Sequence, residues 1–157
     1  MKTIPYILLI LLLAVSAVLH GCGGEQTDED LIKAAIQEMA EGAEAKDPGR
    51  VKGHISDGYK DPAGNDYQAL KGIMAFYFMQ PESINVFLRR QEVEIRDGKG
   101  YATVRAVISR GAKAESVTDL VPSEAGGFSF DFTFEKEGGD WMLTSAIWRQ
   151  VGMAEAL

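Results

Sequence analysis

The sequence predicts an α+β domain in which a curved antiparallel sheet of four long strands packs on three N-terminal helices. Apolar residues recur at helical spacing up to about residue 78. From Ile84 onward they alternate with polar residues, which is typical of half-buried strands. The length of 157 residues suits one domain, and 46% hydrophobic with 25% charged side chains is an ordinary globular composition.

Each predicted helix begins at a capping residue. Thr27 or Asp28 caps the first, Asp47 followed by Pro48 starts a short second one, and Asp66 caps the third, which ends before Pro81. Their apolar stripes are, in chain order, Ile32, Ile36, Met39 and Ala43; Val51 and Ile55; and Leu70, Ile73, Met74, Tyr77 and Phe78.

The strands follow from alternation and turn chemistry. The apolar positions change parity between Leu88 and Val93, which predicts a bulge near residues 90–92 that bends the sheet. A hairpin is predicted at residues 97–98, where Asp is followed by Gly, and a Gly-Gly turn at residues 138–139 precedes a last strand to about residue 150. Phe128, Phe130, Phe132 and Phe134 share one face of the third strand and predict its core side. Residues 59–60 form a possible fifth, short strand, and residues 111–126 a long connection.

The N-terminus predicts a lipoprotein signal peptide over residues 1–21. A basic start at Lys2 precedes an apolar run that ends just before Cys22, the only cysteine of the chain. Residues 19–22, Leu-His-Gly-Cys, resemble a bacterial lipobox, in which the Cys receives a diacylglyceryl group; an uncleaved N-terminal anchor is the alternative. We therefore expect lipidation at Cys22, a tether over residues 22–27, and a lipid anchor in the bacterial cell envelope, with the periplasmic face of the outer membrane favoured.

Charge and residue counts exclude several classes of function. A formal net charge of −7 disfavours nucleic-acid partners. After signal cleavage His54 is the only histidine, so a zinc site of several His or Cys ligands cannot form within one chain. No phosphate loop, dinucleotide fingerprint or nucleophile elbow is present, and we expect neither a cofactor nor a metal.

The order of elements resembles the nuclear-transport-factor-two-like superfamily, a cone-shaped cystatin-like fold shared by ketosteroid isomerases, scytalone dehydratase and polyketide cyclases. Asp47 and Pro48 with Val51 and Ile55, the turn at residues 59–64, and the closing stretch from Gly139 to Trp148 carry the resemblance. It implies one domain over residues 28–152, a tail at 153–157, and a pocket between the concave sheet and the helices at the wide end of the cone.

Enzymes of that superfamily often place Asp, His or Tyr in the pocket. The candidates here are His54 and Asp57, three residues apart, as a general acid–base pair, with Tyr59 as a hydrogen-bond donor. The structural alternative is a histidine favoured by the helix dipole beside a solvated Asp57.

Four further residues are candidates for lining a ligand pocket. Phe76 and Tyr77 could supply aromatic walls, although aromatic residues at helical spacing also fit a core role. Arg90 or Arg105 could turn inward and bind an anionic ligand, while the neighbouring basic residues pair with Glu92, Glu94 and Glu135 on the outer face.

The resulting functional prediction is a membrane-anchored binding module for a small apolar ligand or an envelope protein. An isomerase-, dehydratase- or cyclase-like enzyme that uses His54 and Asp57 is the alternative. A homodimer formed through a sheet face is a third interpretation.

Overall fold

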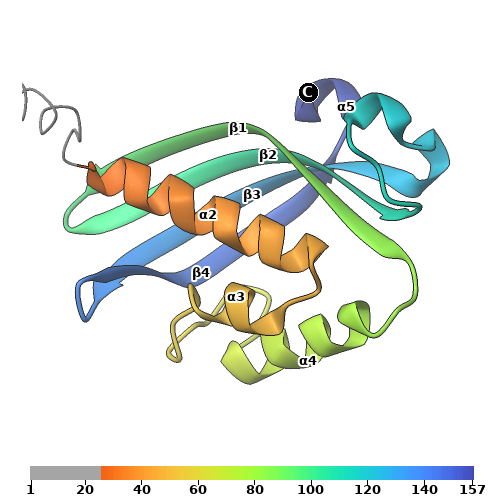
Figure 1. Cartoon of the computed structure of the whole chain (residues 1–157). Helices are drawn as coiled ribbons and strands as arrows, with labels where there is room; N and C mark the ends of the chain where they lie inside the picture. Colours follow the sequence, from red (N-terminus) through yellow and green to blue (C-terminus); the bar gives the residue numbers. More distant parts are fainter. Residues whose placement is uncertain (1–25) are drawn as a thin grey trace, which may run out of the picture.

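A computed structural model describes residues 26–157, and its sheet is antiparallel with the strand order β1-β2-β3-β4 (Figure 1). The elements are α2 (Asp28–Glu44), α3 (Pro48–Lys52), α4 (Tyr67–Phe78), β1 (Ser83–Arg96), β2 (Lys99–Gly111), β3 (Ala125–Glu137), β4 (Asp140–Val151) and α5 (Met153–Ala156). The α+β class with three helices before four long strands is confirmed. The predicted signal peptide and Cys22 lie outside the described residues.

The predicted capping residues start the helices. Thr27 and Asp30 form a reciprocal capping box at the start of α2. The Asp47 carboxylate accepts hydrogen bonds from the backbone N–H groups of Gly49 and Arg50, and Asp66 accepts one from that of Ala69. Within residues 26–157, no helix combines the length and apolar character needed to cross a membrane.

Two-residue turns and two bulges shape the sheet. Asp97 and Gly98 both have positive φ angles, of 51° and 75°, as the favoured hairpin turn requires. The register between β1 and β2 shifts between Leu88 and Arg90, next to the predicted bulge. A second shift, between Thr133 and Phe134 in the β3–β4 pairing, was not predicted. Bulges increase local twist and bend the strands.

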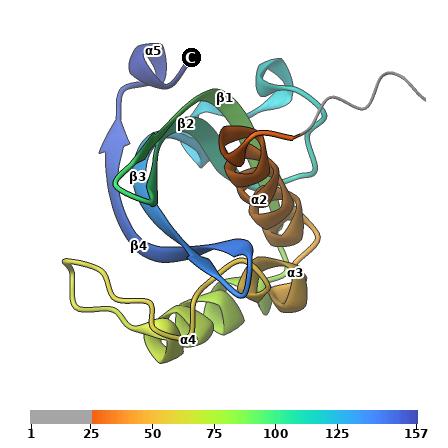
Figure 2. The ribbon, with the colours of Figure 1, turned by 90° about the vertical axis from the view of Figure 1, so that its left-hand side faces the viewer.

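The sheet curls around α2, and α3 and α4 lie across one end of the curve (Figure 2). The core lies between α2 and the concave face. Its buried members include Ile32, Ile36, Tyr59, Phe134, Trp141 and Leu143. Phe134 has no exposed surface, and α2 makes its close sheet contacts chiefly with β1.

The last residues form a helix rather than the predicted tail. Helix α5 lies outside the curve and packs on β2 and β3 (Figure 2). Ala156 is fully buried, and a Cβ on Gly127 would lie 2.7 Å from the Ala156 methyl group. The close approach therefore depends on a glycine beneath the helix.

The predicted short strand is reduced to an isolated bridge between Lys60 and Asp66, and the long connection contains two single 3₁₀ turns, Val117–Asp119 and Pro122–Glu124.

Candidate functional site

A cavity of about 270 Å³ lies between the concave face of the sheet and helices α2, α3 and α4. Every side chain that lines it is apolar. The lining consists of Ile36, Met39, Ala40, Ala43, Val51, Ile55, Leu70, Ile73, Met74, Val86, Leu88, Val104, Ala106, Ile108, Phe130, Phe132 and Leu143. The wall contains no side chain that can exchange a proton or act as a nucleophile, and the only heteroatoms of its side chains are the thioether sulfurs of Met39 and Met74.

Small side chains leave this space open. Ala40 and Ala43 face it from the C-terminal half of α2, and Ala106 faces it from the middle of β2. A methyl group at these positions cannot reach across to the opposite wall. Two members of the phenylalanine row, Phe130 and Phe132, form part of the sheet side.

Helix α4 covers one side of the cavity and is only loosely buried itself. Leu70, Ile73 and Met74 line the cavity, yet none of the twelve residues of α4 is buried. Ile73 is 43% exposed although it contributes to the wall. An apolar helix with so little buried surface is expected to open at lower cost than the sheet or α2.

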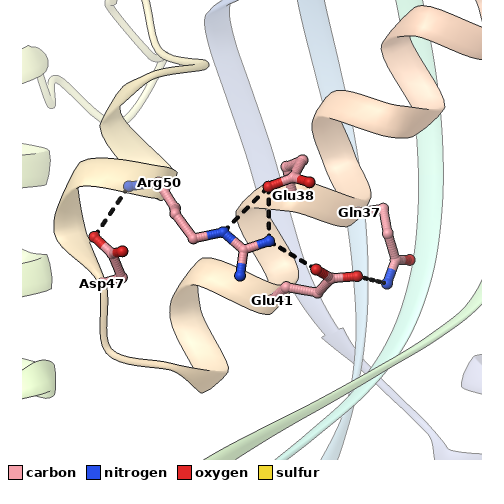
Figure 3. Close-up of polar contacts among 5 residues, drawn as sticks. All are labelled: Gln37, Glu38, Glu41, Asp47 and Arg50. Carbon is pink, nitrogen blue, oxygen red and sulfur yellow. Dashed lines mark hydrogen bonds and ion pairs between the residues drawn. The ribbon is translucent and has the colours of Figure 1, made fainter.

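A charged cluster fixes α3 against α2 (Figure 3). The Arg50 Nη2 atom lies 2.7 Å from a carboxylate oxygen of Glu38 and 2.7 Å from one of Glu41. The Gln37 amide also donates to Glu41, over 2.9 Å. Hydrogen bonds from Gln37 and Arg50 lower the pKa of Glu41, and those to Glu38 and Glu41 raise the pKa of Arg50. The cluster positions Val51, the next residue, at the cavity wall.

The structure separates the candidate catalytic residues from the cavity. His54 is half-buried, and its carbonyl oxygen accepts a hydrogen bond of 2.8 Å from the backbone N–H of Leu143. Asp57 is exposed, and within residues 26–157 no hydrogen bond joins its side chain to that of His54. Neither residue lines the cavity, so they do not form an acid–base pair there.

Tyr59 belongs to the core and to a loop network. Its side chain is 2% exposed, and its hydroxyl donates to Asp61 over 3.2 Å. Burial, together with the charge of Asp61, raises the pKa of Tyr59. Burial alone would raise the pKa of Asp61, but hydrogen bonds from Asn65 and Tyr59 outweigh it and lower that pKa. This network stabilises the turn before α4.

Among the described residues, no group of three or more His, Cys, Asp or Glu side chains could hold a metal ion.

The four residues predicted to line a pocket also lie elsewhere. Phe76 is 61% exposed and packs edge-to-face against Tyr77, which is 42% exposed. Arg90 and Arg105 are cross-strand partners on the opposite face of the sheet from Val104 and Ala106. The prediction that these residues line the cavity is corrected for all four. Strand alternation turns Arg90 and Arg105 to the other face of the sheet, and Phe76 and Tyr77 lie on α4 outside the lining, with Tyr77 beyond the wall residue Met74.

The two arginines form outer-face ion pairs. The distance is 2.8 Å from Arg90 to Glu92 and 3.2 Å from Arg105 to Glu155 of α5. Two other predicted outer-face pairings are also present, Lys99 with Glu135 at 2.7 Å and Arg96 with Glu94 at 3.3 Å.

Comparison with known proteins identifies the fold but not a function. No family model matches the sequence, and no curated protein matches it. Solved structures do match. A proposed dehydratase of the NTF2-like family from Streptomyces avermitilis aligns with a TM-score of 0.65 and 17% identity, over 81% of this chain and 99% of that one. An NTF2-like protein of unknown function from Pseudomonas putida aligns with a TM-score of 0.64 and 15% identity, over 80% of this chain and 88% of that protein.

Bd1075 of Bdellovibrio bacteriovorus aligns with a TM-score of 0.64 and 11% identity. That match covers 78% of this chain but only 40% of Bd1075, so this chain spans less than half the length of that protein. The chain therefore has the NTF2-like, cone-shaped fold, as its sequence resemblance implied. Identities this low show the fold alone, since this fold carries many unrelated functions.

Proposed function

We propose that the protein is a binding module that holds a small apolar molecule in the cavity, at a membrane surface to which a lipid on Cys22 attaches it. The observation that carries the proposal is the chemistry of the wall, which is apolar throughout. Binding pockets are predominantly apolar with a few polar groups that orient the ligand. A wall without any such group favours a hydrocarbon part of a ligand over a polar metabolite.

The size of the cavity supports a ligand and sets its scale. An apolar cavity of about 150 Å³ in an engineered protein holds benzene. By proportion, about 270 Å³ holds roughly eleven carbon atoms. A hydrocarbon that covers this apolar wall removes it from water, which is favourable by ~25 cal/mol per Å² of apolar surface.

The dehydratase description of a structural neighbour does not carry over to this cavity. A general acid or base must lie within hydrogen-bond reach of the proton that it moves. His54, Asp57 and Tyr59 do not line the wall, and no other titratable side chain does. We therefore propose binding in preference to the isomerase- or dehydratase-like alternative.

The test is to extract the purified full chain with organic solvent and identify the released molecules by mass spectrometry. We expect hydrocarbon chains of about ten to twelve carbons. Ala106→Leu adds three carbons to the wall and should shorten the preferred chain by about three.

Ala102→Leu is the matched control. Ala102 lies on the same strand and the same face but does not line the cavity, and this variant should keep the wild-type preference. A set of released molecules that is the same in all three proteins would contradict the proposal.

A further inference from the structure

Arg110 lies at one end of the cavity, on the cavity side of the sheet. It follows Ile108, a wall residue, by two positions on β2, so both face the same side. Its guanidinium lies over the ring of Tyr77, 5.4 Å from the centroid. Tyr77 in turn follows the wall residue Met74 by three positions on α4. The stacked pair therefore spans from β2 to α4 just beyond the apolar wall.

The donors of Arg110 are free to bind an anion. Within residues 26–157, no carboxylate lies within 4 Å of its guanidinium, and its side chain makes no hydrogen bond. Stacking on an aromatic ring uses the face of the guanidinium and leaves the in-plane N–H groups available. Those groups match the two oxygens of a carboxylate.

Four other charged groups lie toward this end, and none of them pairs with Arg110 in the described part of the chain. One is Glu124, whose carboxylate lies against Gly111. Lys46, three residues after the wall residue Ala43, donates to the carbonyl oxygen of Gln80 at the end of α4. Glu44 accepts a hydrogen bond of 2.8 Å from the backbone N–H of Val86. Glu82 is exposed, and among residues 26–157 it forms no ion pair with Arg110.

We propose that the ligand is a medium-chain carboxylate whose hydrocarbon chain fills the cavity and whose carboxylate binds Arg110. This inference rests on the proposed function and adds the head group to it. The apolar wall explains the chain, and the stacked arginine explains why an anionic head group is preferred to a neutral or cationic one. Arg110 replaces Arg90 and Arg105 as the anion-binding arginine, because those two lie on the outer face.

The test compares decanoate with decanol by titration calorimetry on the full chain, below the concentration at which either ligand aggregates. Arg110→Gln should weaken decanoate binding about fivefold, the upper range for a solvent-exposed ion pair, and leave decanol within twofold. Arg96→Gln is the matched control, because Arg96 also stacks on a tyrosine, Tyr101 at 4.6 Å, but lies on the opposite face of the sheet and pairs with Glu94. It should change neither affinity.

The outcomes separate this inference from the proposed function. If decanol binds the wild type and Ala106→Leu weakens it, but Arg110→Gln leaves decanoate unchanged, the carboxylate assignment is wrong and the apolar ligand stands. An equal loss of decanoate affinity in Arg110→Gln and Arg96→Gln also overturns the assignment. If neither decanol nor decanoate binds the wild type, both proposals fail.

Discussion

Filling the cavity should stabilise the protein, and the same substitution nearby should destabilise it. Ala106 is fully buried on β2 and lines the cavity, whereas Ala102, 2% exposed on the same strand, packs in the filled core. Ala106→Leu adds three carbons that can enter open space. At ~0.8 kcal/mol for each buried carbon, and after about 1 kcal/mol for ordering the side chain, the net gain is about 1.5 kcal/mol.

Ala102→Leu has no such space and should cost about 1–3 kcal/mol, because core neighbours must move to admit it. Both values come from urea unfolding of delipidated full chain followed by circular dichroism, where a shifted midpoint at constant slope reports stability. If Ala106→Leu loses as much stability as Ala102→Leu, the space beside Ala106 is not available and the size argument for the ligand fails.

Three further predictions concern the scaffold and the anchor. Gly42→Ala should destabilise the protein by about 1–3 kcal/mol in urea unfolding, because the added Cβ would lie 2.9 Å from the Cβ of Arg50. Gly72→Ala is the control: its Cβ would enter open space on α4, and the variant should be more stable than the wild type by up to about 1 kcal/mol. Folding lowers the pKa of Asp61, so the ionised carboxylate stabilises the protein above the ordinary pKa of aspartate, and this stability is lost as the pH falls through the lowered pKa. Asp61→Ala should therefore flatten the decline of the unfolding free energy below about pH 4. An unchanged decline would contradict the role of the Asp61 network. Labelled palmitate should be incorporated into the wild type and not into Cys22→Ser, and equal labelling would refute the predicted lipid anchor.

Local patterns in the sequence were sufficient to predict most of the fold. The capping residues Thr27, Asp47 and Asp66 start the helices because each carries an oxygen that accepts from free backbone N–H groups. The change of parity after Leu88 predicted the bend, since an extra residue in one strand reverses which side chains face the core. Helix α5 was missed because four residues without a capping side chain carry little local signal, and its stability depends on the contact of Ala156 with Gly127.

The site could not be predicted in the same way, because its main feature is a cavity, a space between elements that no side chain fills. Ala40, Ala43 and Ala106 are ordinary residues in a helix or a strand, and only the assembled fold brings them around one space. Reactive and exposed aromatic side chains are what a sequence displays directly, and those that it displays here, such as His54 and Phe76, do not line the cavity. Face alternation was available as a signal, since Arg110 shares parity with Ala106 and Ile108 whereas Arg105 does not.

The apolar wall also bears on the choice between binding and catalysis. Enzymes of a similar shape would need a proton-transferring group inside the cavity, and a buried, unpaired charge there would cost several kcal/mol without hydrogen-bonding partners. No lining residue offers such a partner by its side chain. A carboxylate held outside by Arg110 avoids that cost, because the charge stays near solvent while the chain gains the transfer free energy of burial. Under the proposed function, the ligand would be an amphiphile whose tail is held in the cavity and whose head is oriented at Arg110.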